Sequence, residues 1–189
     1  MVELPPPYVE GLIARCAEAR ASEPSIRPLL VLYGNRQLDA EESLAEDIRF
    51  ALAARAKAPG LAIDVGAGFG AVILALSLAS PDPVVGIEIA EHRARYLQEE
   101  LERLRLRHAR AVCADAFGCE LTAARFIFLN NPFFSEERER FLDKVTRECR
   151  PGTVIVATNL IVRALRARPA FREDLQPQTR YRLGLFRLV

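Results

Sequence analysis

The feature that most constrains this chain is a glycine-rich turn between two apolar segments. Leu61 to Val65 is an apolar run that contains one acid, Asp64, and Ala71 to Ala79 is a second apolar run. The turn between them alternates glycine with other residues, at Gly66, Gly68 and Gly70. This pattern predicts a buried strand, a tight turn with few side chains and a buried helix. Glycines in such a turn let the backbone bend sharply and let a ligand approach the main chain.

The spacing of the turn separates it from the dinucleotide-binding pattern. The order is Asp-x-Gly-x-Gly-x-Gly, whereas the dinucleotide pattern is Gly-x-Gly-x-x-Gly with a pyrophosphate at the helix start. A carboxylate at Asp64 would repel a pyrophosphate, so a ligand with a positive centre and no phosphate fits better. Taken alone, the turn is also compatible with a tight structural connection.

The rest of the chain predicts an α/β fold. Helical patterns before residue 59 and alternating strands and helices after it predict a mostly parallel sheet covered on both faces. The last two strands have no helix between them, which predicts a hairpin with an antiparallel edge strand. We therefore expect a seven-stranded, doubly wound, Rossmann-like sheet plus N-terminal helices, in one compact domain. Residues 1–58 form an N-terminal helical segment and residues 59–189 form the core. The expected strands are Leu61 to Val65, Val84 to Ile89, Arg110 to Ala114, Phe126 to Leu129, Thr153 to Thr158, Phe171 to Gln176 and Arg182 to Val189. The expected helices include Pro7 to Ala21, one that begins after a cap at Asp39, Glu91 to Arg107, and one that begins after a cap at Ser135.

Composition excludes several classes of protein and partner. The 189 residues carry a formal net charge of +1, so no strong overall field draws the chain to nucleic acid or to a membrane. No apolar stretch approaches the ~20 residues of a membrane span, and no signal peptide is visible, so a cytoplasmic location is expected. The four cysteines match no zinc pattern, and no metal site is expected. They are expected to be free thiols, although Cys113 and Cys119 are close enough in sequence to pair.

Acids lie at or just after the carboxyl ends of the first three expected strands, at Asp64, Glu88 and Asp115. Ligands of open α/β sheets bind at the carboxyl ends of the strands, so these acids are expected to lie near one another. Glu88 can accept both ribose hydroxyls of a nucleoside, and Asp115 can accept from an adenine amine while Phe117 packs on the ring. Each acid alone also fits a turn or a helix start, but the three together predict a nucleoside site.

The fourth strand ends in Asn130-Asn131-Pro132-Phe133-Phe134. Asn-x-Pro-Phe resembles the Asn-Pro-Pro-Phe or Tyr signature of amino-group methyltransferases, with Asn131 in place of the first proline. An asparagine carbonyl and a neighbouring backbone carbonyl can orient the hydrogens of an attacking amine, and the aromatic residues exclude water. The alternative is that Asn130 to Pro132 only ends a strand.

Two resemblances connect these motifs. The glycine turn resembles the first motif of class I S-adenosylmethionine-dependent methyltransferases. Together with Tyr33-Gly34-Asn35, Gly86-Ile87-Glu88-Ile89 and the Asn130 motif, the chain resembles the non-SET histone-lysine methyltransferases of the disruptor-of-telomeric-silencing type. Asn35 replaces an acid of that family, and the family's long basic extension is missing. The chain therefore looks like a compact archaeal or bacterial relative, for which a histone substrate does not follow.

The resemblance implies a cofactor, S-adenosylmethionine, and two groups of site residues. The cofactor-binding residues are Asp64, Gly66, Gly68, Gly70, Glu88, Asp115, Ala116 and Phe117. The catalytic residues are Asn130, Pro132, Phe133 and Tyr33, with Tyr33 closing over the methionine moiety from a loop in the N-terminal segment. The implied reaction is direct methyl transfer to a lysine of a protein, of which a small chromatin protein is one candidate.

Two alternatives stay open at this point. One is methylation of an adenine or glutamine amino group through the same Asn-x-Pro-Phe; direct nucleic-acid binding is not indicated, because the arginines are interleaved with acids. The other is a non-catalytic scaffold that binds S-adenosylmethionine.

Overall fold

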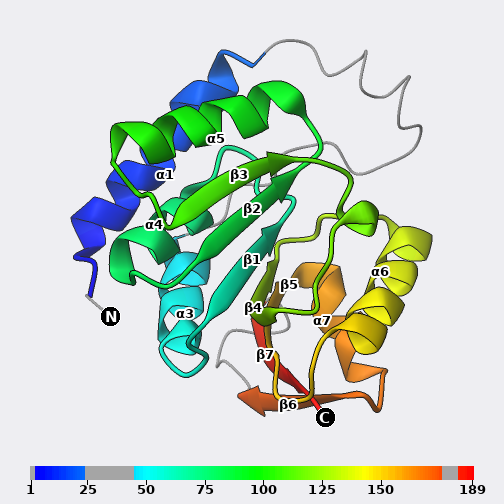
Figure 1. The fold of residues 1–189 in the computed structure, drawn as a ribbon. Coiled ribbons are helices and arrows are strands. Elements are labelled where there is room, and N and C mark those ends of the chain that lie inside the picture. Colours follow the sequence, from blue (N-terminus) through cyan, green and yellow to red (C-terminus); the bar gives the residue numbers. More distant parts are fainter. Residues whose placement is uncertain (1–2, 24–44, 176–182) are drawn as a thin grey trace.

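The computed structural model describes residues 3–23, 45–175 and 183–189, and within them the strands form a single sheet (Figure 1). The strand order across the sheet is β3-β2-β1-β4-β5-β7-β6. The strands are β1 (Leu61–Val65), β2 (Val84–Glu88), β3 (Ala109–Cys113), β4 (Ala124–Leu129), β5 (Val154–Thr158), β6 (Phe171–Leu175) and β7 (Leu183–Leu188). The order reverses direction between β1 and β4, which is where open α/β sheets bind ligands.

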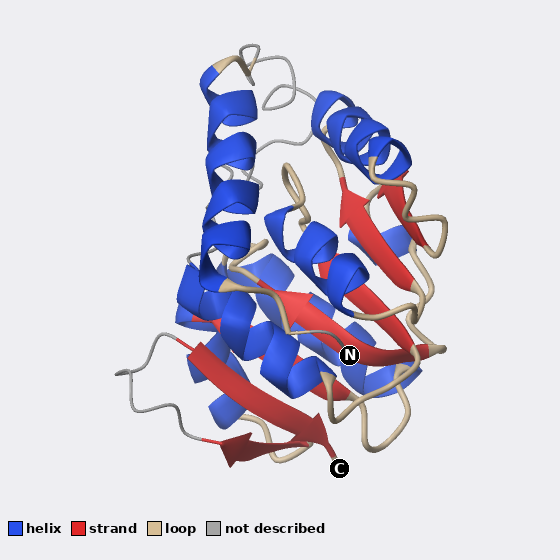
Figure 2. Cartoon of the chain, turned by 90° about the vertical axis from the view of Figure 1, so that its left-hand side faces the viewer, coloured by secondary structure: helices blue, strands red, loops and turns tan. Residues whose placement is uncertain are grey.

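The sheet is mostly parallel. β1 pairs in parallel with β2 and β4, and parallel pairing extends to β3 on one side and β5 on the other. β7 runs antiparallel to both β5 and β6, so the two last strands form the expected hairpin at this edge (Figure 2). The predicted fold class is therefore confirmed, with β7 between β5 and the outermost strand β6.

Helices cover both faces of the sheet. One face carries α1 (Pro6–Ala21), α3 (Ala45–Arg55), α4 (Ala71–Ala79) and α5 (Glu91–Arg103); the other carries α6 (Ser135–Glu148) and α7 (Asn159–Arg166). Successive side chains of a strand point to opposite faces. Along β4, Phe126 and Phe128 therefore join the core under α1, α3 and α4, whereas Ile127 and Leu129 join the core under α6 and α7. This two-sided burial explains why β4 is apolar from Phe126 to Leu129, whereas Arg125 near its start is exposed.

The element boundaries differ from the expectations in a few places. The helix expected to run to Arg107 ends at Arg103, because Arg105 has a left-handed backbone with φ 56°. Ser135, expected as the helix cap, is the first residue of α6; Phe134 occupies the cap position and makes no side-chain cap hydrogen bond. The expected cap at Asp39 lies outside the described residues.

The structure also shows the state of the cysteines. All four cysteines are free thiols, so Cys113 and Cys119 do not pair, and Cys113 is exposed on β3. Within residues 3–23, 45–175 and 183–189, no helix has the length and apolarity to cross a membrane. The same part of the chain contains no group of three or more potential metal ligands.

Candidate active site

The turn after β1 is fixed to β2 and open to an incoming ligand. The N–H groups of Gly66 and Ala67 both donate to the carbonyl of Ile87, at 2.8 and 3.0 Å. Gly68 has a left-handed backbone with φ +56°, and a side chain placed there would meet no atom within 4 Å. Gly66 differs, because a Cβ at this residue would lie 2.8 Å from Cβ of Pro132. The open side of the turn is therefore at Gly68, and Gly66 is where the loop after β4, which contains Pro132, approaches; we call this segment, residues 130–134, the acceptor loop.

Glu88 connects the turn to the next helix. Its carboxylate is buried, with Oε2 accepting from the N–H of Gly68 at 2.8 Å and Oε1 accepting from the N–H of Ala90 at 2.9 Å. A carboxylate has about four acceptor positions, so these two bonds use about half of them. The predicted role toward two ribose hydroxyls is thus compatible with the role that the structure shows, which is to hold the turn.

Asp64 is buried in the middle of the sheet. It lies on β1 opposite Gly86 of β2 and Phe128 of β4. Burial, and secondarily the nearby charge of Glu88, raise the pKa of Asp64 to about 7. A carboxylate in this state gains a large electrostatic benefit from a cation placed beside it. Asp64 is therefore suited to a positively charged ligand group, as its position in the sequence predicts.

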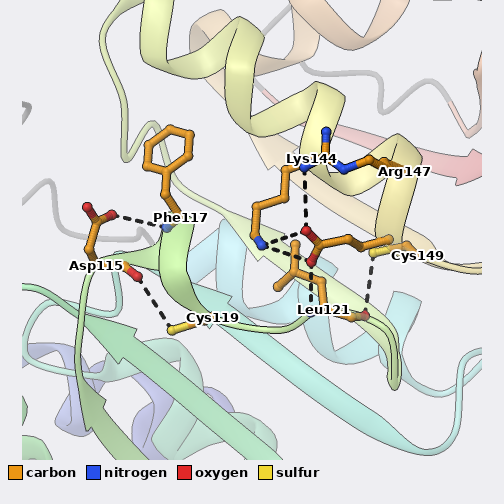
Figure 3. Close-up of polar contacts among 8 residues, drawn as sticks. Asp115, Phe117, Cys119, Leu121, Lys144, Arg147 and Cys149 are labelled. Atoms are coloured by element: carbon orange, nitrogen blue, oxygen red, sulfur yellow. Dashed lines mark hydrogen bonds and ion pairs between the residues drawn. The ribbon is translucent and has the colours of Figure 1, made fainter.

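The segment after β3 forms one turn of 3-10 helix, η1 (Ala116–Gly118). Asp115 caps it, with Oδ1 accepting from the N–H of Phe117 at 3.0 Å (Figure 3). The ring of Phe117 lies 5.4 Å from that of Phe133 and 5.8 Å from that of Phe141 between centroids, and the guanidinium of Arg140 lies 5.0 Å over it. The ring is thus part of an aromatic cluster, and its packing on adenine stays a prediction.

A partly buried ion pair holds the segment that follows η1 against α6. Nζ of Lys144 lies 2.7 and 2.8 Å from the two carboxylate oxygens of Glu148, and Oε2 of Glu148 accepts from the N–H of Leu121 at 3.3 Å (Figure 3). Sγ of Cys149 also donates to the carbonyl of Leu121. These contacts fix where the η1 turn lies relative to α6, and through it where Asp115 lies.

The loop after β4 contains the expected acceptor residues. Oδ1 of Asn130 accepts from the hydroxyl of Thr158 at 2.6 Å. The ring of Phe133 packs against that of Phe141 at 4.7 Å between centroids, so it belongs to the same cluster as Phe117. Phe134, by contrast, is 48% exposed. The exposed aromatic surface of this loop is therefore provided by Phe134.

Asn131 has a left-handed backbone, with φ 51°. Proline is locked near φ −65°, so it cannot occupy this position without rebuilding the loop. Asparagine is among the few residues that adopt this conformation readily. The loop therefore differs from the Asn-Pro-Pro-Phe signature in its backbone conformation as well as in its sequence.

The structure brings the two predicted groups of residues together. Asp64, Glu88, Asp115 and the glycine turn lie at the carboxyl ends of β1, β2 and β3, and the loop of Asn130 follows the adjacent β4 (Figure 1). The groups meet where Gly66 approaches Pro132 and where Phe117 contacts Phe133. Tyr33 lies outside the described residues.

Sequence reasoning missed Thr158 and the pair of Lys144 and Glu148. Thr158 follows the same strand-end rule as the acids, since it is the last residue of β5, and applying the rule to the fifth strand would have found it. Lys144 and Glu148 are four residues apart in one helix, a spacing that predicts a pair but not its burial.

Comparison with known proteins gives matches only among solved structures. No family model and no curated protein matches the chain. A methyltransferase from Geobacter sulfurreducens superposes with a TM-score of 0.68 at 18% identity, covering 100% of this chain and 93% of its own. An O-methyltransferase from Bacillus cereus, solved with S-adenosylhomocysteine, gives 0.65 at 17% identity, covering 96% and 90%. An RNA methyltransferase from Salinibacter ruber, solved with the same ligand, gives 0.62 at 14% identity, covering 78% and 92%. None of these three is described as a lysine methyltransferase. The chain therefore has the Rossmann-like fold of class I S-adenosylmethionine-dependent methyltransferases.

Proposed function

We propose that this protein binds S-adenosylmethionine and transfers its methyl group to an amine. The observation that carries the proposal is the set of three acids, Asp64, Glu88 and Asp115, arranged around the glycine turn at adjacent strand ends. Their chemistry fits the three polar parts of that cofactor. The raised pKa of Asp64 suits the ammonium group, the remaining acceptor positions of Glu88 suit the ribose hydroxyls, and Asp115 suits the adenine amine.

The open space beside Gly68 supports this fit. Close approach of a ligand to the main chain requires a residue without a side chain, and a Cβ at Gly68 would project into space that no protein atom occupies. Two of the compared structures contain S-adenosylhomocysteine, the product form of the cofactor. The cofactor supplies a methyl group already activated by its sulfonium, so the protein's residues mainly have to bind, align and desolvate.

Asn130 is the residue we assign to the acceptor. Its carboxamide follows β4 beside the glycine turn, and its oxygen can accept an N–H of an amine so that the nitrogen lone pair faces the methyl carbon. The amine must be neutral to react, and the apolar surroundings formed by Pro132 and Phe133 favour the neutral form of an amine. This arrangement favours a nitrogen acceptor, because an N–H must be held while the lone pair attacks.

A lysine of a protein is the acceptor we favour. The left-handed Asn131 rules out the double proline of the adenine and glutamine signature and leaves the Asn-Asn order that resembles the lysine enzymes. Glu136 is exposed in the first turn of α6, next to Phe134. A negative charge at this place attracts a basic segment of a protein, such as that of a small chromatin protein.

An amino group of an RNA base is a second candidate. The exposed ring of Phe134 favours it, since aromatic side chains stack on unpaired bases. One of the compared structures is described as an RNA methyltransferase.

Methyl transfer from labelled S-adenosylmethionine tests the proposal. The protein is incubated with cell lysate and with purified small basic proteins, with and without nuclease, and the label is mapped. Asn130→Ala serves as the matched variant, with cofactor affinity measured by calorimetry. We expect label on lysine in a protein band, insensitive to nuclease, and its loss in Asn130→Ala at nearly unchanged affinity.

The other outcomes count against specific parts of the proposal. Label removed by nuclease would move the acceptor to RNA. Parallel loss of affinity and transfer in Asn130→Ala would overturn the role of Asn130. Tight cofactor binding without transfer to any acceptor would favour a non-catalytic scaffold.

A further inference from the structure

We infer that Thr158 is a positioning residue that fixes the carboxamide of Asn130 with its oxygen in the orientation that an amine acceptor needs. The inference rests on the proposed function for the role of Asn130, and it adds a residue that neither the sequence motifs nor the compared folds assign.

The sheet itself places the two residues together. β4 and β5 pair in parallel with Leu129 opposite Ala157, so the next residues, Asn130 and Thr158, lie side by side at the carboxyl end. Thr158 is fully buried, and its hydroxyl is 2.6 Å from Oδ1 of Asn130. A hydroxyl buried at the end of a central strand has few partners to choose from, so this contact is well defined.

The direction of the hydrogen bond selects the orientation of the amide. Nδ2 of Asn159 lies 3.5 Å from the hydroxyl oxygen of Thr158 and can only donate to it. The hydroxyl hydrogen is then free to donate to Asn130, and it finds an acceptor there only when the amide oxygen, not the nitrogen, is on that side. Rotation of the amide by half a turn would bring an N–H of Asn130 against the hydroxyl, beside the N–H of Asn159. The hydroxyl would then face two donors and lose its acceptor. Thr158 therefore favours one of the two amide orientations.

The orientation matters for the reaction. An amine offers N–H groups, which an amide oxygen accepts and an amide N–H repels. An amide oxygen can accept two hydrogen bonds, so the bond from Thr158 is compatible with a second one from the substrate. Without the hydroxyl, the carboxamide rotates between both orientations, and the fraction that can align the amine falls. Loss of alignment lowers the rate of transfer and leaves cofactor binding at Asp64 and Glu88 unchanged.

Thr158→Val tests this, because valine has nearly the shape of threonine and lacks the hydroxyl. We expect kcat, measured with the acceptor that the labelling experiment identifies, to fall about tenfold. This corresponds to about 1.4 kcal/mol, the net value of one oriented hydrogen bond. The affinity for S-adenosylmethionine stays constant, and Thr158→Ser restores most of the rate. In an Asn130→Ala background, Thr158→Val should not lower the residual rate further, since the group that it orients is gone.

Thr153 provides a matched control at the other end of the same strand, just before its first residue. It is also fully buried, immediately precedes β5, and donates its hydroxyl to the carbonyl of Ala124 at 3.1 Å at the opposite end of the β4–β5 pair. Thr153→Val removes an equivalent hydrogen bond and should leave kcat unchanged. Equal loss of activity in Thr153→Val and Thr158→Val would overturn the inference, because it would show a general effect on stability. Wild-type kcat in Thr158→Val would overturn it as well.

A spectroscopic measurement separates this inference from the proposed function. The side-chain NH₂ signals of Asn130, identified as those absent in Asn130→Ala, should shift in Thr158→Val and return in Thr158→Ser. If the wild type methylates no acceptor, shifted signals still support the orienting contact and only the function proposed for it fails. Signals that stay in place in Thr158→Val overturn the inference whether or not the wild type is active.

Discussion

Replacing Asp64 with asparagine should stabilise the fold at neutral pH while weakening cofactor binding. The pKa of Asp64 is raised from 3.8 to about 7 by burial and by the charge of Glu88. Because the folded state holds its proton more tightly than the unfolded state, stability falls as pH rises from about 4 to about 7 and is constant above that. About three pKa units at 1.4 kcal/mol each give a cost of about 4 kcal/mol when Asp64 is ionised. Asparagine has no charge and avoids this cost.

Urea unfolding of wild type and Asp64→Asn at two pH values measures the effect. At pH 8 the variant should be more stable by up to about 4 kcal/mol, or roughly 8–16 °C in Tm for a domain of this size. At pH 5 the gain should shrink to about 2 kcal/mol, because the wild-type Asp64 is then mostly protonated in the fold. Asp115→Asn is the matched control. Asparagine caps a turn as well as aspartate does, so its stability should change by less than about 0.5 kcal/mol at both pH values.

Cofactor affinity should depend on pH in the opposite direction to stability: it should rise as pH rises. Ionised Asp64 is the form that attracts an ammonium group, so the affinity of the wild type for S-adenosylmethionine should fall by about tenfold for each pH unit below 7 and level off above it. Asp64→Asn should bind weakly at all these pH values. A variant that is less stable than wild type at pH 8, or equally stabilised at pH 5 and pH 8, would refute the reasoning. Wild-type affinity that does not change between pH 6 and pH 8 would refute the role of the charge.

Two further predictions concern the glycine turn and its neighbour. In urea unfolding, Gly66→Ala should destabilise the protein by more than Gly68→Ala. Both residues have a positive φ, which costs alanine about 1 kcal/mol. Only at position 66 does the new Cβ also press on Cβ of Pro132, at 2.8 Å. Equal losses of stability would mean that the acceptor loop moves aside freely. Glu88→Gln should shift the pH midpoint of cofactor binding below that of the wild type, because removing this negative charge lowers the pKa of Asp64. A midpoint that stays in place in calorimetric titrations would contradict the assigned coupling.

The strands and the acids were predictable from the sequence because each depends on local patterns. β1 was predicted at its observed boundaries, since a strand buried on both faces is apolar at nearly every position, here at all but Asp64. The acids were found because a parallel sheet places the ends of its strands at one edge, whatever the exact pairing. The N-terminal helix α1 was found to within one residue from its apolar face.

The parts that the sequence did not predict depend on pairing between distant segments. The bond between Thr158 and Asn130 joins residues 28 apart in the chain and follows from the register of β4 against β5. The left-handed backbone of Asn131 follows from the path that the loop takes past Gly66, and a pattern of residue types does not specify that path. The ring of Phe117 was assigned to adenine from its place after Asp115, whereas its packing depends on Phe133 and Phe141, which arrive from α6 and the preceding loop.

These contacts between distant segments fix the relative positions of the loops that form the site. The loop after β4 lies against two segments, with Pro132 next to Gly66 of the glycine turn and the ring of Phe133 against that of Phe117 in η1. Direct methyl transfer needs the nucleophile and the methyl carbon aligned to within a fraction of an ångström, and misplacement of about 1 Å can cost ~100-fold in rate. In the proposed reaction, packing of the glycine turn against the loop after β4 would set this distance. In this proposal, the packing sets the distance and the hydroxyl of Thr158 sets the rotation of the Asn130 amide.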